Sequence, residues 1–380
     1  MRPIKQQQDI YLSIGSNQGN KFEFLQMAVN AIFEQIGSIV KISSVYKTPA
    51  IGFDGDDFLN SVLLVRSNMS SKKILETILE IENKLGRVRS ENGGYVSRTI
   101  DIDILLIGNL VKNTIKLQIP HPEIQNRKFV LKPLADVNPG LFHPVLDKDI
   151  VTLLAETEDD SVIEKQSKWL RNPKKDYDLS RFKYIAIEGN IGAGKTSLVN
   201  QLAQDFNAKL ILERFKDNPF LPKFYKNPQR YAFPLEMSFL ADRYQQLVDD
   251  ITKFNLFKDF VIADYDVNKS MIFANVTLQD EEFNLYKKLF QLMYKELPKP
   301  NMYVYLYQNT DCLIENIKKR GRGYEQSIEV DYLEKINDGY IQFIKSQPED
   351  TFRMIDISDR DFVNNRKDYL YILTQILKEL

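Results

Sequence analysis

The spacing of apolar residues changes repeatedly between strand-like and helical periods along the first third of the chain. Short alternating or continuous apolar runs predict strands, and longer runs with apolar residues every three or four positions predict helices. The expected strands are residues 9–14, 39–46, 57–65, 99–107 and 115–119, and the expected helices are residues 21–36 and 70–85. The resulting order β-α-β-β-α-β predicts a ferredoxin-like α+β domain.

The second half of the chain follows a different pattern, in which short apolar runs alternate with amphipathic helices. The expected strands are residues 184–188, 209–213, 260–264, 302–307 and 352–357, and the expected helices are residues 197–206, 234–254, 280–294, 311–319 and 330–346. Strands and helices that alternate in this way form a parallel sheet with helices on both faces. The second half is therefore predicted to be an α/β domain.

A highly charged stretch with few aliphatic residues, 156–181, separates these two patterns. A chain of 380 residues is also longer than one ordinary domain. We therefore expect an N-terminal domain over residues 1–165, a linker over residues 166–181 and a C-terminal domain over residues 182–380.

Composition narrows the class of protein. The net charge of −1 gives no argument for a nucleic-acid partner. No apolar run has the length of a membrane span, and the first residues lack the apolar segment of an export signal. The single cysteine cannot form a disulfide within the chain, which suits a reducing compartment. We expect a cytoplasmic protein with no nucleic-acid or membrane partner.

The most specific chemical motif is GNIGAGKT at Gly189–Thr196, which matches the phosphate-binding pattern G-x-x-x-x-G-K-[ST]. A predicted strand precedes it and a predicted helix follows it, so backbone N–H groups and the helix dipole converge on one point. The loop residues expected to cradle the phosphates of ATP are Gly189, Asn190, Ile191, Gly192, Ala193 and Gly194. We expect Lys195 to reach the β- and γ-phosphates and the Thr196 hydroxyl to bind Mg²⁺.

The first half carries an unrelated set of residues suited to polyphosphate chemistry, in the stretch 86–103. Asp101 and Asp103 are two positions apart on a predicted strand, so both carboxylates face the same side, where they could bind Mg²⁺. Arg87 and Arg98 precede them beside a glycine-rich stretch and could clamp a polyphosphate. The Asp-x-Asp pattern is short, and a solvated charged strand edge is the alternative interpretation.

Separated motifs in this half occur in the order found in one enzyme family. They are GSN at residues 15–17, SSVYKTPAIG at 43–52, FLN at 58–60, LGRVR at 85–89, SRTIDIDILL at 97–106 and PHPEIQNRKFVL at 120–131. On these residues the N-terminal half, over roughly residues 8–165, resembles the 6-hydroxymethyl-7,8-dihydropterin pyrophosphokinases of folate synthesis. The resemblance implies transfer of a pyrophosphoryl group from ATP to the hydroxymethyl oxygen of the pterin.

The resemblance also implies roles for individual residues. They are Asp101 and Asp103 for two Mg²⁺ ions, Arg87 and Arg98 for the triphosphate, Glu82, His121 and Arg127 for the nucleotide, and Thr48, Pro49, Ile51, Asn60 and Phe129 for the pterin pocket. An aromatic ring and an amide suit a flat heterocycle that forms hydrogen bonds. The chain departs from some members at Phe58 and at Gly94 or Tyr95, where they have tyrosine or tryptophan.

The second half has two further features that a P-loop kinase for small molecules needs, a carboxylate base and an arginine-rich lid. Glu213 ends a predicted strand, where its side chain faces the crevice at the carboxyl edge of the sheet. Arg320 and Arg322, in the sequence KKRGRGYEQ, could clamp a transferring phosphoryl group, although a solvated basic loop is the alternative. A switch-type GTPase is not favoured, because the chain has no N-K-x-D motif.

This half resembles the deoxynucleoside kinases, and their bacterial purine-preferring branch in particular. The matching stretches are GNIGAGKT, LERFKDNPFLPKFY at residues 212–225, RYAFPLEMSFLADR at 230–243, KKRGRGYEQ at 318–326 and DYLEKIND at 331–338. The resemblance implies phosphorylation of a deoxynucleoside 5′-hydroxyl by a homodimer that forms through this domain. The implied residues are Glu213 as general base, Tyr225 and Glu325 for the sugar 3′-hydroxyl, Arg243 for positioning the base or substrate, and Arg320 and Arg322 in the lid.

Two departures from this family bear on activity and specificity. Asp264-Tyr265-Asp266 stands where the family usually has an acidic residue, arginine and serine, so Asp264 can still serve Mg²⁺ but the positive charge is missing. Glu236 stands where the family usually has glutamine. An ionised carboxylate accepts two hydrogen bonds from guanine N1–H and N2–H₂, whereas glutamine matches adenine or cytosine. We therefore predict a deoxyguanosine preference.

The sequence as a whole predicts a bifunctional enzyme that uses ATP and Mg²⁺ and acts on two small molecules, a pterin and a deoxynucleoside. The alternative is an active pyrophosphokinase joined to a degenerate nucleotide-binding or dimerisation module. The presence together of Lys195, Thr196, Glu213, Arg320 and Arg322 argues against a lost kinase site.

Overall fold

The computed structural model describes residues 7–50, 52–88, 96–214, 218–252, 258–295, 297–348 and 351–378. Contacts divide these residues into two compact units, and the boundary falls between Tyr177 and Asp178. Each unit has its own main sheet and its own buried core. No helix among the described residues combines the length and the apolarity that a membrane span requires.

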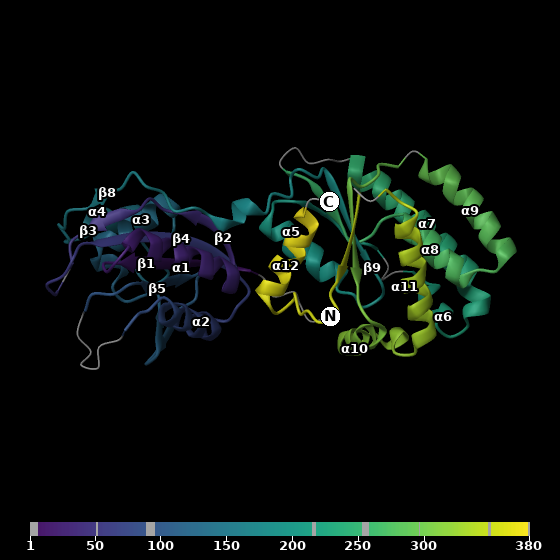
Figure 1. The fold of residues 1–380 in the computed structure, drawn as a ribbon, viewed down its shortest axis with the longest axis horizontal. Helices are drawn as coiled ribbons and strands as arrows, with labels where there is room; N and C mark the ends of the chain where they lie inside the picture. Colours follow the sequence, from purple (N-terminus) through teal and green to yellow (C-terminus); the bar gives the residue numbers. More distant parts are fainter. Residues whose placement is uncertain are drawn as a thin grey trace. The chain divides into compact units, whose positions relative to one another are not determined.

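The N-terminal unit is an α+β structure built on an antiparallel sheet (Figure 1). Its strands are β1 (Gln8–Ser16), β2 (Ser38–Ile42), β3 (Tyr46–Thr48), β4 (Phe58–Ser67), β5 (Asp101–Ile107), β6 (Lys112–Thr114), β7 (Leu117–Ile119) and β8 (Glu164–Lys165). Its helices are α1 (Lys21–Gln35), α2 (Ser71–Lys84), α3 (Lys128–Val137) and α4 (Ile150–Glu156), with 3-10 turns at Ile124–Asn126 and Pro173–Asp176. The main sheet has the order β5-β1-β4-β3-β8, with β2 also paired to β4, and every pairing is antiparallel.

Two of the expected strands differ from the prediction. The run 39–46 is divided into β2 and β3, because between them the Ser43 hydroxyl replaces a backbone acceptor for the Val62 N–H, at 2.9 Å. The run 115–119 supplies only β7, which pairs with β6 in a hairpin outside the main sheet. Helix α3 is not expected from the sequence, and Pro133 inside it obscures the helical pattern.

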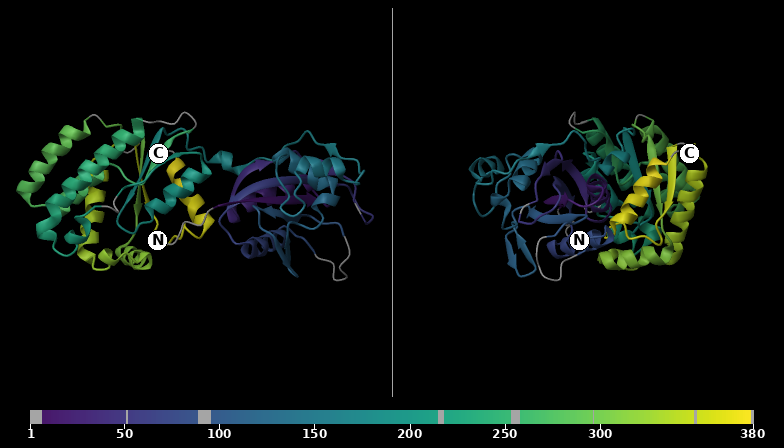
Figure 2. Two further views of the ribbon diagram at one scale, coloured as in Figure 1. Left: turned by 180° about the vertical axis from the view of Figure 1, so that it is seen from behind. Right: turned by 60° about the vertical axis from the view of Figure 1, so that its left-hand side comes forward.

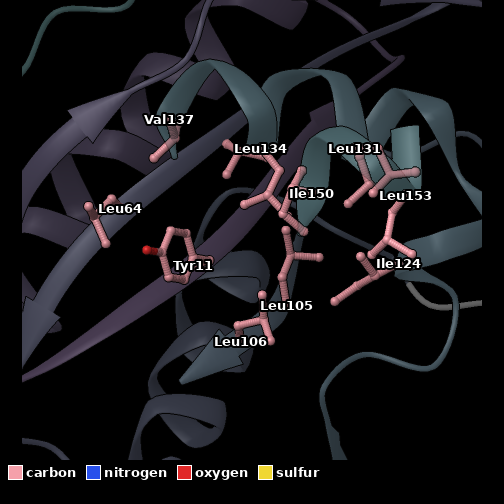
Figure 3. Packing of buried hydrophobic residues seen from close by; sticks show 12 residues of the cluster. Tyr11, Leu64, Leu105, Leu106, Ile124, Leu131, Leu134, Val137, Ile150 and Leu153 are labelled. Atoms are coloured by element: carbon pink, nitrogen blue, oxygen red, sulfur yellow. The ribbon is translucent and has the colours of Figure 1, made fainter. Parts of the chain in front are cut away.

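Helices α3 and α4 bury one face of the sheet. Figure 3 shows Leu134 of α3 and Ile150 of α4 packed with Tyr11 of β1 in one apolar cluster. The alternate positions of β1, among them Ile10 and Leu12, are fully buried too, and α1 and α2 contact β1 and β5. Because alternate residues of a strand face opposite sides, both faces of this sheet are covered.

The segment that follows α4 also packs on the N-terminal unit. Strand β8 pairs with β3, and the Asn172 side chain donates to the Ile39 carbonyl at 2.9 Å. The ring of Tyr177 lies 5.8 Å from that of Phe33 in α1. Much of the stretch predicted as a linker therefore contacts α1 and β2.

The C-terminal unit is an α/β structure with a parallel sheet, as predicted. Its strands are β9 (Tyr184–Gly189), β10 (Lys209–Ile211), β11 (Val261–Ala263), β12 (Met302–Tyr307) and β13 (Phe352–Asp356). Its helices are α5 (Lys195–Asp205), α6 (Leu221–Phe224), α7 (Pro228–Thr252), α8 (Asn268–Thr277), α9 (Asp280–Tyr294), α10 (Thr310–Arg320), α11 (Val330–Lys345) and α12 (Arg366–Leu377), with a 3-10 turn at Gly323–Glu325. The strand order is β10-β11-β9-β12-β13, and every pairing is parallel.

Helices cover both faces of this sheet. Figures 1 and 2 show α5 and α12 on one side of the sheet, and α7, α8 and α11 on the other side, where α8 contacts both α7 and α11. The carboxyl ends of parallel strands meet at one edge of a sheet. The glycine-rich loop after β9, Glu213 after β10 and Asp264 after β11 therefore share that edge.

Candidate active sites

A cavity of about 540 Å³ opens in the N-terminal unit. The predicted site residues that line it are Thr48, Pro49, Asn60, Arg87, Arg98, Asp101, Asp103, His121, Arg127 and Phe129. Glu82 lies directly behind it, in contact with Arg87, and Ile51 lies outside the described residues. Residues distant in the sequence are thus brought to one place.

The end of the cavity near β3 and β4 presents a fixed amide. The Asn60 side chain donates to the Thr48 hydroxyl at 2.8 Å, and both residues are buried. Gly15 of β1 pairs in register with Asn60, and a Cβ at that position would lie 2.7 Å from Asn60 Oδ1. The glycine therefore leaves the space that the amide occupies.

The opposite side of the cavity concentrates charge. Asp101 and Asp103 lie at the start of strand β5 and line the cavity together, as their spacing predicted. The Arg98 guanidinium contacts the Asp101 carboxylate at 2.9 Å. Arg87 bridges Asp101 and the buried Glu82, which also accepts the Ile102 N–H at 2.9 Å. Two arginines and two carboxylates are therefore held in one network.

The carboxyl of Asp103, which lies near this network, has a raised pKa. Burial, followed by the negative charges of Asp101 and Glu82, raises its pKa to about 7. Closely spaced carboxylates with hard oxygen donors fit Mg²⁺, which would relieve the repulsion between them. No cluster of three or more His, Cys, Asp or Glu side chains suited to a metal occurs within the described ranges. Asp101 and Asp103 nevertheless offer oxygen donors that suit Mg²⁺ at this cavity.

The motif PHPEIQNRKFVL at residues 120–131 places the imidazole of His121 and the aromatic ring of Phe129 at the cavity. Burial, and then the charge of Arg127, lower the pKa of His121, whose Nδ1 accepts the Glu123 N–H at 3.2 Å. The Arg127 guanidinium lies 5.8 Å from the centre of the Phe129 ring. This side of the cavity therefore combines a cation, a neutral imidazole and a flat apolar surface.

The cavity is also lined by residues that have no role in the sequence-based prediction. They are Ser13, Gly15, Gly52, Phe53, Phe58, Glu123, Asn126 and Asp159. Asp159 follows α4, and its carboxylate accepts the Lys128 N–H at the start of α3 at 2.7 Å. It lies far along the chain from the motifs, in a charged stretch with no pattern, so no sequence signal marks it.

The glycine-rich loop of the C-terminal unit connects β9 to α5 as the motif predicts. Gly192 and Gly194 have φ angles of 90° and 81°, a region that favours glycine. The Lys195 ammonium donates to the carbonyls of Gly189 and Asn190 at 2.8 and 2.9 Å. The loop is therefore closed around the lysine that is expected to meet phosphate.

A hydroxyl and a carboxylate lie side by side at the start of α5. Thr196 donates to the Asp264 carboxylate at 2.6 Å, and the other Asp264 oxygen accepts the Glu213 N–H at 2.7 Å. Both side chains offer oxygen, which Mg²⁺ prefers. This donor pair therefore suits a metal ion bound next to the glycine-rich loop.

Glu213 is clamped between two cations. Its Oε1 accepts from Arg243 at 2.7 and 2.9 Å, and its Oε2 accepts from the Lys269 ammonium at 2.6 Å. Burial acts against ionisation, but Lys269 and Arg243 hold the pKa of this carboxyl well below its usual range. Lys269 is absent from the predicted residues, although it occupies the first turn of α8, close after the Asp264-Tyr265-Asp266 departure.

Glu236 lies within α7 and is 2 % exposed. Its Oε1 accepts from the Thr277 hydroxyl at 3.2 Å, and its Oε2 has no hydrogen-bond partner among the described residues. Burial raises the pKa of Glu236 to about 7, against the lowering influence of Arg243 and Thr277. A buried carboxylate oxygen without a partner is costly, which indicates that it meets a ligand.

The predicted lid and sugar residues also come together. Glu325 is buried and pairs with Arg320 at 2.6 Å and with Arg322 at 3.0 Å. Tyr225 lies close enough for the charge of Glu325 to raise its pKa, after burial as the main cause. The two arginines are therefore joined to the carboxylate that is expected to bind the sugar.

Comparison with known proteins agrees with both halves of this description. The family model described as "Deoxynucleoside kinase" matches residues 185–380, and the model described as "7,8-dihydro-6-hydroxymethylpterin-pyrophosphokinase (HPPK)" matches residues 11–139. The chain is 43 % identical over 201 residues to "Deoxyguanosine kinase" of Bacillus subtilis, an alignment that covers 52 % of this chain and 97 % of that protein.

Two further proteins are similar to parts of the chain, one by sequence and one by its solved structure. The chain is 41 % identical over 138 residues to "2-amino-4-hydroxy-6-hydroxymethyldihydropteridine pyrophosphokinase" of Porphyromonas gingivalis, covering 36 % of this chain and 93 % of that protein. The structure of deoxyadenosine kinase from M. mycoides with bound dATP aligns at 25 % identity and a TM-score of 0.44, covering 50 % of this chain and 97 % of that one. The chain belongs to the 7,8-dihydro-6-hydroxymethylpterin-pyrophosphokinase family in its first half and to the deoxynucleoside kinase family in its second half.

Proposed function

We propose that this protein is a bifunctional ATP-dependent enzyme. The N-terminal unit transfers a pyrophosphoryl group from ATP to 6-hydroxymethyl-7,8-dihydropterin and releases AMP. The C-terminal unit transfers the γ-phosphoryl group of ATP to the 5′-hydroxyl of a deoxynucleoside, with deoxyguanosine preferred. Membership of both families supports the two reactions, and the retained charged residues of each site support their activity.

In the N-terminal site the protein positions two substrates and balances charge. Asn60 and Thr48 hold the edge of the pterin by hydrogen bonds, and Phe129 stacks on its face. Asp101 and Asp103 would hold two Mg²⁺ ions, which would supply positive charge to the phosphates. Arg87 and Arg98, already fixed on carboxylates, are placed to meet the triphosphate. Such a reaction depends on alignment and electrostatics rather than on covalent help from the protein.

In the C-terminal site Glu213 orients the nucleoside 5′-hydroxyl and accepts its proton. The loop Gly189–Thr196 would cradle the phosphates of ATP, and Thr196 with Asp264 would hold Mg²⁺. Tyr225 and Glu325 bind the sugar 3′-hydroxyl. Binding of the sugar at Glu325 would compete for Arg320 and Arg322, which can then turn to the transferring phosphoryl group.

One observation carries the preference for deoxyguanosine, the buried Glu236 carboxylate whose Oε2 has no partner among the described residues. Guanine presents two adjacent donors, N1–H and N2–H₂, to two carboxylate oxygens. Adenine presents a donor beside an acceptor, which leaves one oxygen facing a lone pair. The similarity to a relative named deoxyguanosine kinase supports the same choice.

We also infer several properties of the whole protein. The N-terminal strand order β5-β1-β4 with β2 and β3 outside β4 supports a ferredoxin-like topology. We propose that residues 1–165 and 182–380 form the two catalytic domains, with the intervening residues up to Tyr177 packed on the first of them. We also propose a cytoplasmic location and a homodimer formed through the kinase half. Light scattering at micromolar concentration tests the dimer, and a monomer would refute it.

The test is an ATP-consumption assay with the purified full chain, Mg²⁺ and each of the four deoxynucleosides in turn, with products identified by mass. We expect deoxyguanosine monophosphate to form fastest. In parallel, the same preparation should release AMP with hydroxymethyl-dihydropterin. AMP release without turnover of any deoxynucleoside would show that the second half has become a binding or dimerisation module.

A further inference from the structure

Lys269 is a buried cation of the kinase site that lies outside all of the sequence motifs quoted above for the kinase half. It is 8 % exposed and lies in the first turn of α8. A lysine near a helix N-terminus is opposed by the helix dipole, and a buried ammonium is costly without compensation. The local structure therefore does not explain this residue type at this position.

Its surroundings indicate a role in phosphoryl transfer. The ammonium donates to Glu213 Oε2 at 2.6 Å, and after burial its charge is the next cause that lowers the pKa of Lys195. It thus lies between the proposed base and the lysine of the phosphate-binding loop. The residue directly after Asp264 is Tyr265, whose fully buried ring packs in the apolar core and brings no charge to the site.

Donor geometry separates Lys269 from the other cation on Glu213. Arg243 directs Nε and Nη2 to Glu213 and Nη1 to the Ser270 hydroxyl at 2.8 Å. All three nitrogens of its guanidinium group therefore already have partners, and the group holds Glu213 in place. The Lys269 ammonium has three N–H donors, and the hydrogen bonds within the described part of the chain give it one acceptor, Glu213. Two donors remain for oxygens of the substrates. Glu213 with both cations also leaves one positive charge in excess, which suits an incoming phosphoryl group.

We propose that Lys269 is a catalytic residue of the kinase half, which holds Glu213 and donates a hydrogen bond to the transferring phosphoryl group. This inference rests on the kinase function proposed above. In the reaction the nucleoside 5′-oxygen forms a bond to the γ-phosphorus while the bond from that phosphorus to the β,γ-bridging oxygen breaks. The bond electrons stay with ADP, and the 5′-hydroxyl proton passes to Glu213. Lys269 stays protonated throughout and stabilises charge on the equatorial oxygens.

The experiment compares Lys269→Met and Lys269→Arg in the full chain with Lys335→Met, which removes an exposed lysine on α11. For Lys269→Met we expect kcat for deoxyguanosine to fall roughly 100- to 1,000-fold, with the nucleoside KM and the affinity for ATP alone unchanged within about threefold. Lys269→Arg should keep at least about a tenth of wild-type kcat, because it retains the charge. AMP formation by the N-terminal unit of the same molecules measures the concentration of intact protein.

The outcomes separate a catalytic role from a structural one. A Lys269→Met protein with kcat within about threefold of wild type would overturn the proposal. A joint loss of kcat, ATP affinity and melting temperature that Lys269→Arg does not restore would also overturn it. If Lys269→Met does not fold, Lys269→Gln against Lys269→Arg gives the same decision. Absence of deoxynucleoside turnover by the wild-type protein would instead refute the proposed kinase function itself.

Discussion

Replacement of Glu236 by glutamine should exchange one purine preference for the other. Glu236 is buried in α7, accepts from Thr277 at 3.2 Å through Oε1, and has its Oε2 without a partner among the described residues. Glu236→Gln changes one acceptor oxygen into an NH₂ donor with almost no change in shape. One N–H donor of guanine would then face the NH₂ donor of the glutamine. Adenine would instead pair its acceptor with that NH₂ group and its donor with the amide oxygen.

The magnitude follows from the charged hydrogen bond that is lost. A hydrogen bond to a charged partner contributes about 1.5–3 kcal/mol, and leaving a buried donor unpaired costs a similar amount. A net loss of about 2–3 kcal/mol in the transition state lowers kcat/KM for deoxyguanosine roughly 30- to 150-fold. Deoxyadenosine should gain, because its acceptor no longer faces a carboxylate oxygen.

The protonation of Glu236 gives the same argument a pH dependence. Burial raises its pKa to about 7 from an ordinary value of 4.5. The neutral acid carries one donor and one acceptor, as glutamine does, and only the ionised form offers two acceptors. The ratio of kcat/KM for deoxyguanosine to that for deoxyadenosine should therefore rise between pH 6 and pH 8. In Glu236→Gln this ratio should not change with pH.

Stability provides a readout that does not depend on turnover. Because the pKa of Glu236 is higher in the folded protein than its ordinary 4.5, folding favours the neutral form, and stability is lost as the pH rises through about 7. The difference corresponds to roughly 3 kcal/mol at pH 8. Glu236→Gln should therefore raise the melting temperature of the kinase half at pH 8, by an amount that shrinks as the pH falls.

The assay measures ADP formation with both purine deoxynucleosides from pH 6 to pH 8. Glu334→Gln, which changes an exposed glutamate on α11, is the matched control and should leave specificity and melting temperature unchanged. A Glu236→Gln protein that still prefers deoxyguanosine at every pH would refute the assignment of Glu236 to base recognition. A melting temperature lowered at pH 8 would refute the account of its burial.

Other substitutions test the two sites separately. Asp101→Asn or Asp103→Asn should lower AMP formation at least about 100-fold and leave deoxynucleoside turnover unchanged, because Mg²⁺ loses a charged ligand. Lys195→Met should do the reverse, with loss of ADP formation at least about 100-fold while AMP formation with the pterin continues. Gly15→Ala should raise the pterin KM roughly tenfold, since its Cβ would lie 2.7 Å from Asn60 Oδ1 and displace the amide. Steady-state kinetics of both reactions on each variant decides these outcomes.

The regular parts of both folds could be predicted because their patterns are local. Strand β9, the glycine-rich loop and α5 form one continuous signal, and the structure confirms it. The division of 39–46 into β2 and β3 depends instead on one hydroxyl, that of Ser43, which bonds to the neighbouring strand. Helix α3 contains a proline, which usually marks a helix end. Periodicity contains neither kind of information.

Site residues could be predicted where a motif carries them and not where only the fold assembles them. Asp101 and Asp103 share a face because strands have a period of two residues, and the structure places both at the cavity. Asp159 reaches the same cavity only because its segment returns to cap the start of α3. Lys269 reaches Glu213 only because α8 begins beside the end of β10. Contacts of this kind are set by tertiary packing, which one sequence does not display.

The two sites solve the same electrostatic problem in opposite ways. Around Asp103, burial and then the negative charges of Asp101 and Glu82 raise the pKa of the carboxyl, against the lowering influence of Arg127 and Arg87. Around Glu213 the protein supplies two cations of its own and holds the pKa low. Metal ions that enter with ATP would therefore relieve the repulsion between the carboxylates of the first site. The second site already carries cations that suit phosphate, so a metal ion at Thr196 and Asp264 would have less charge to balance.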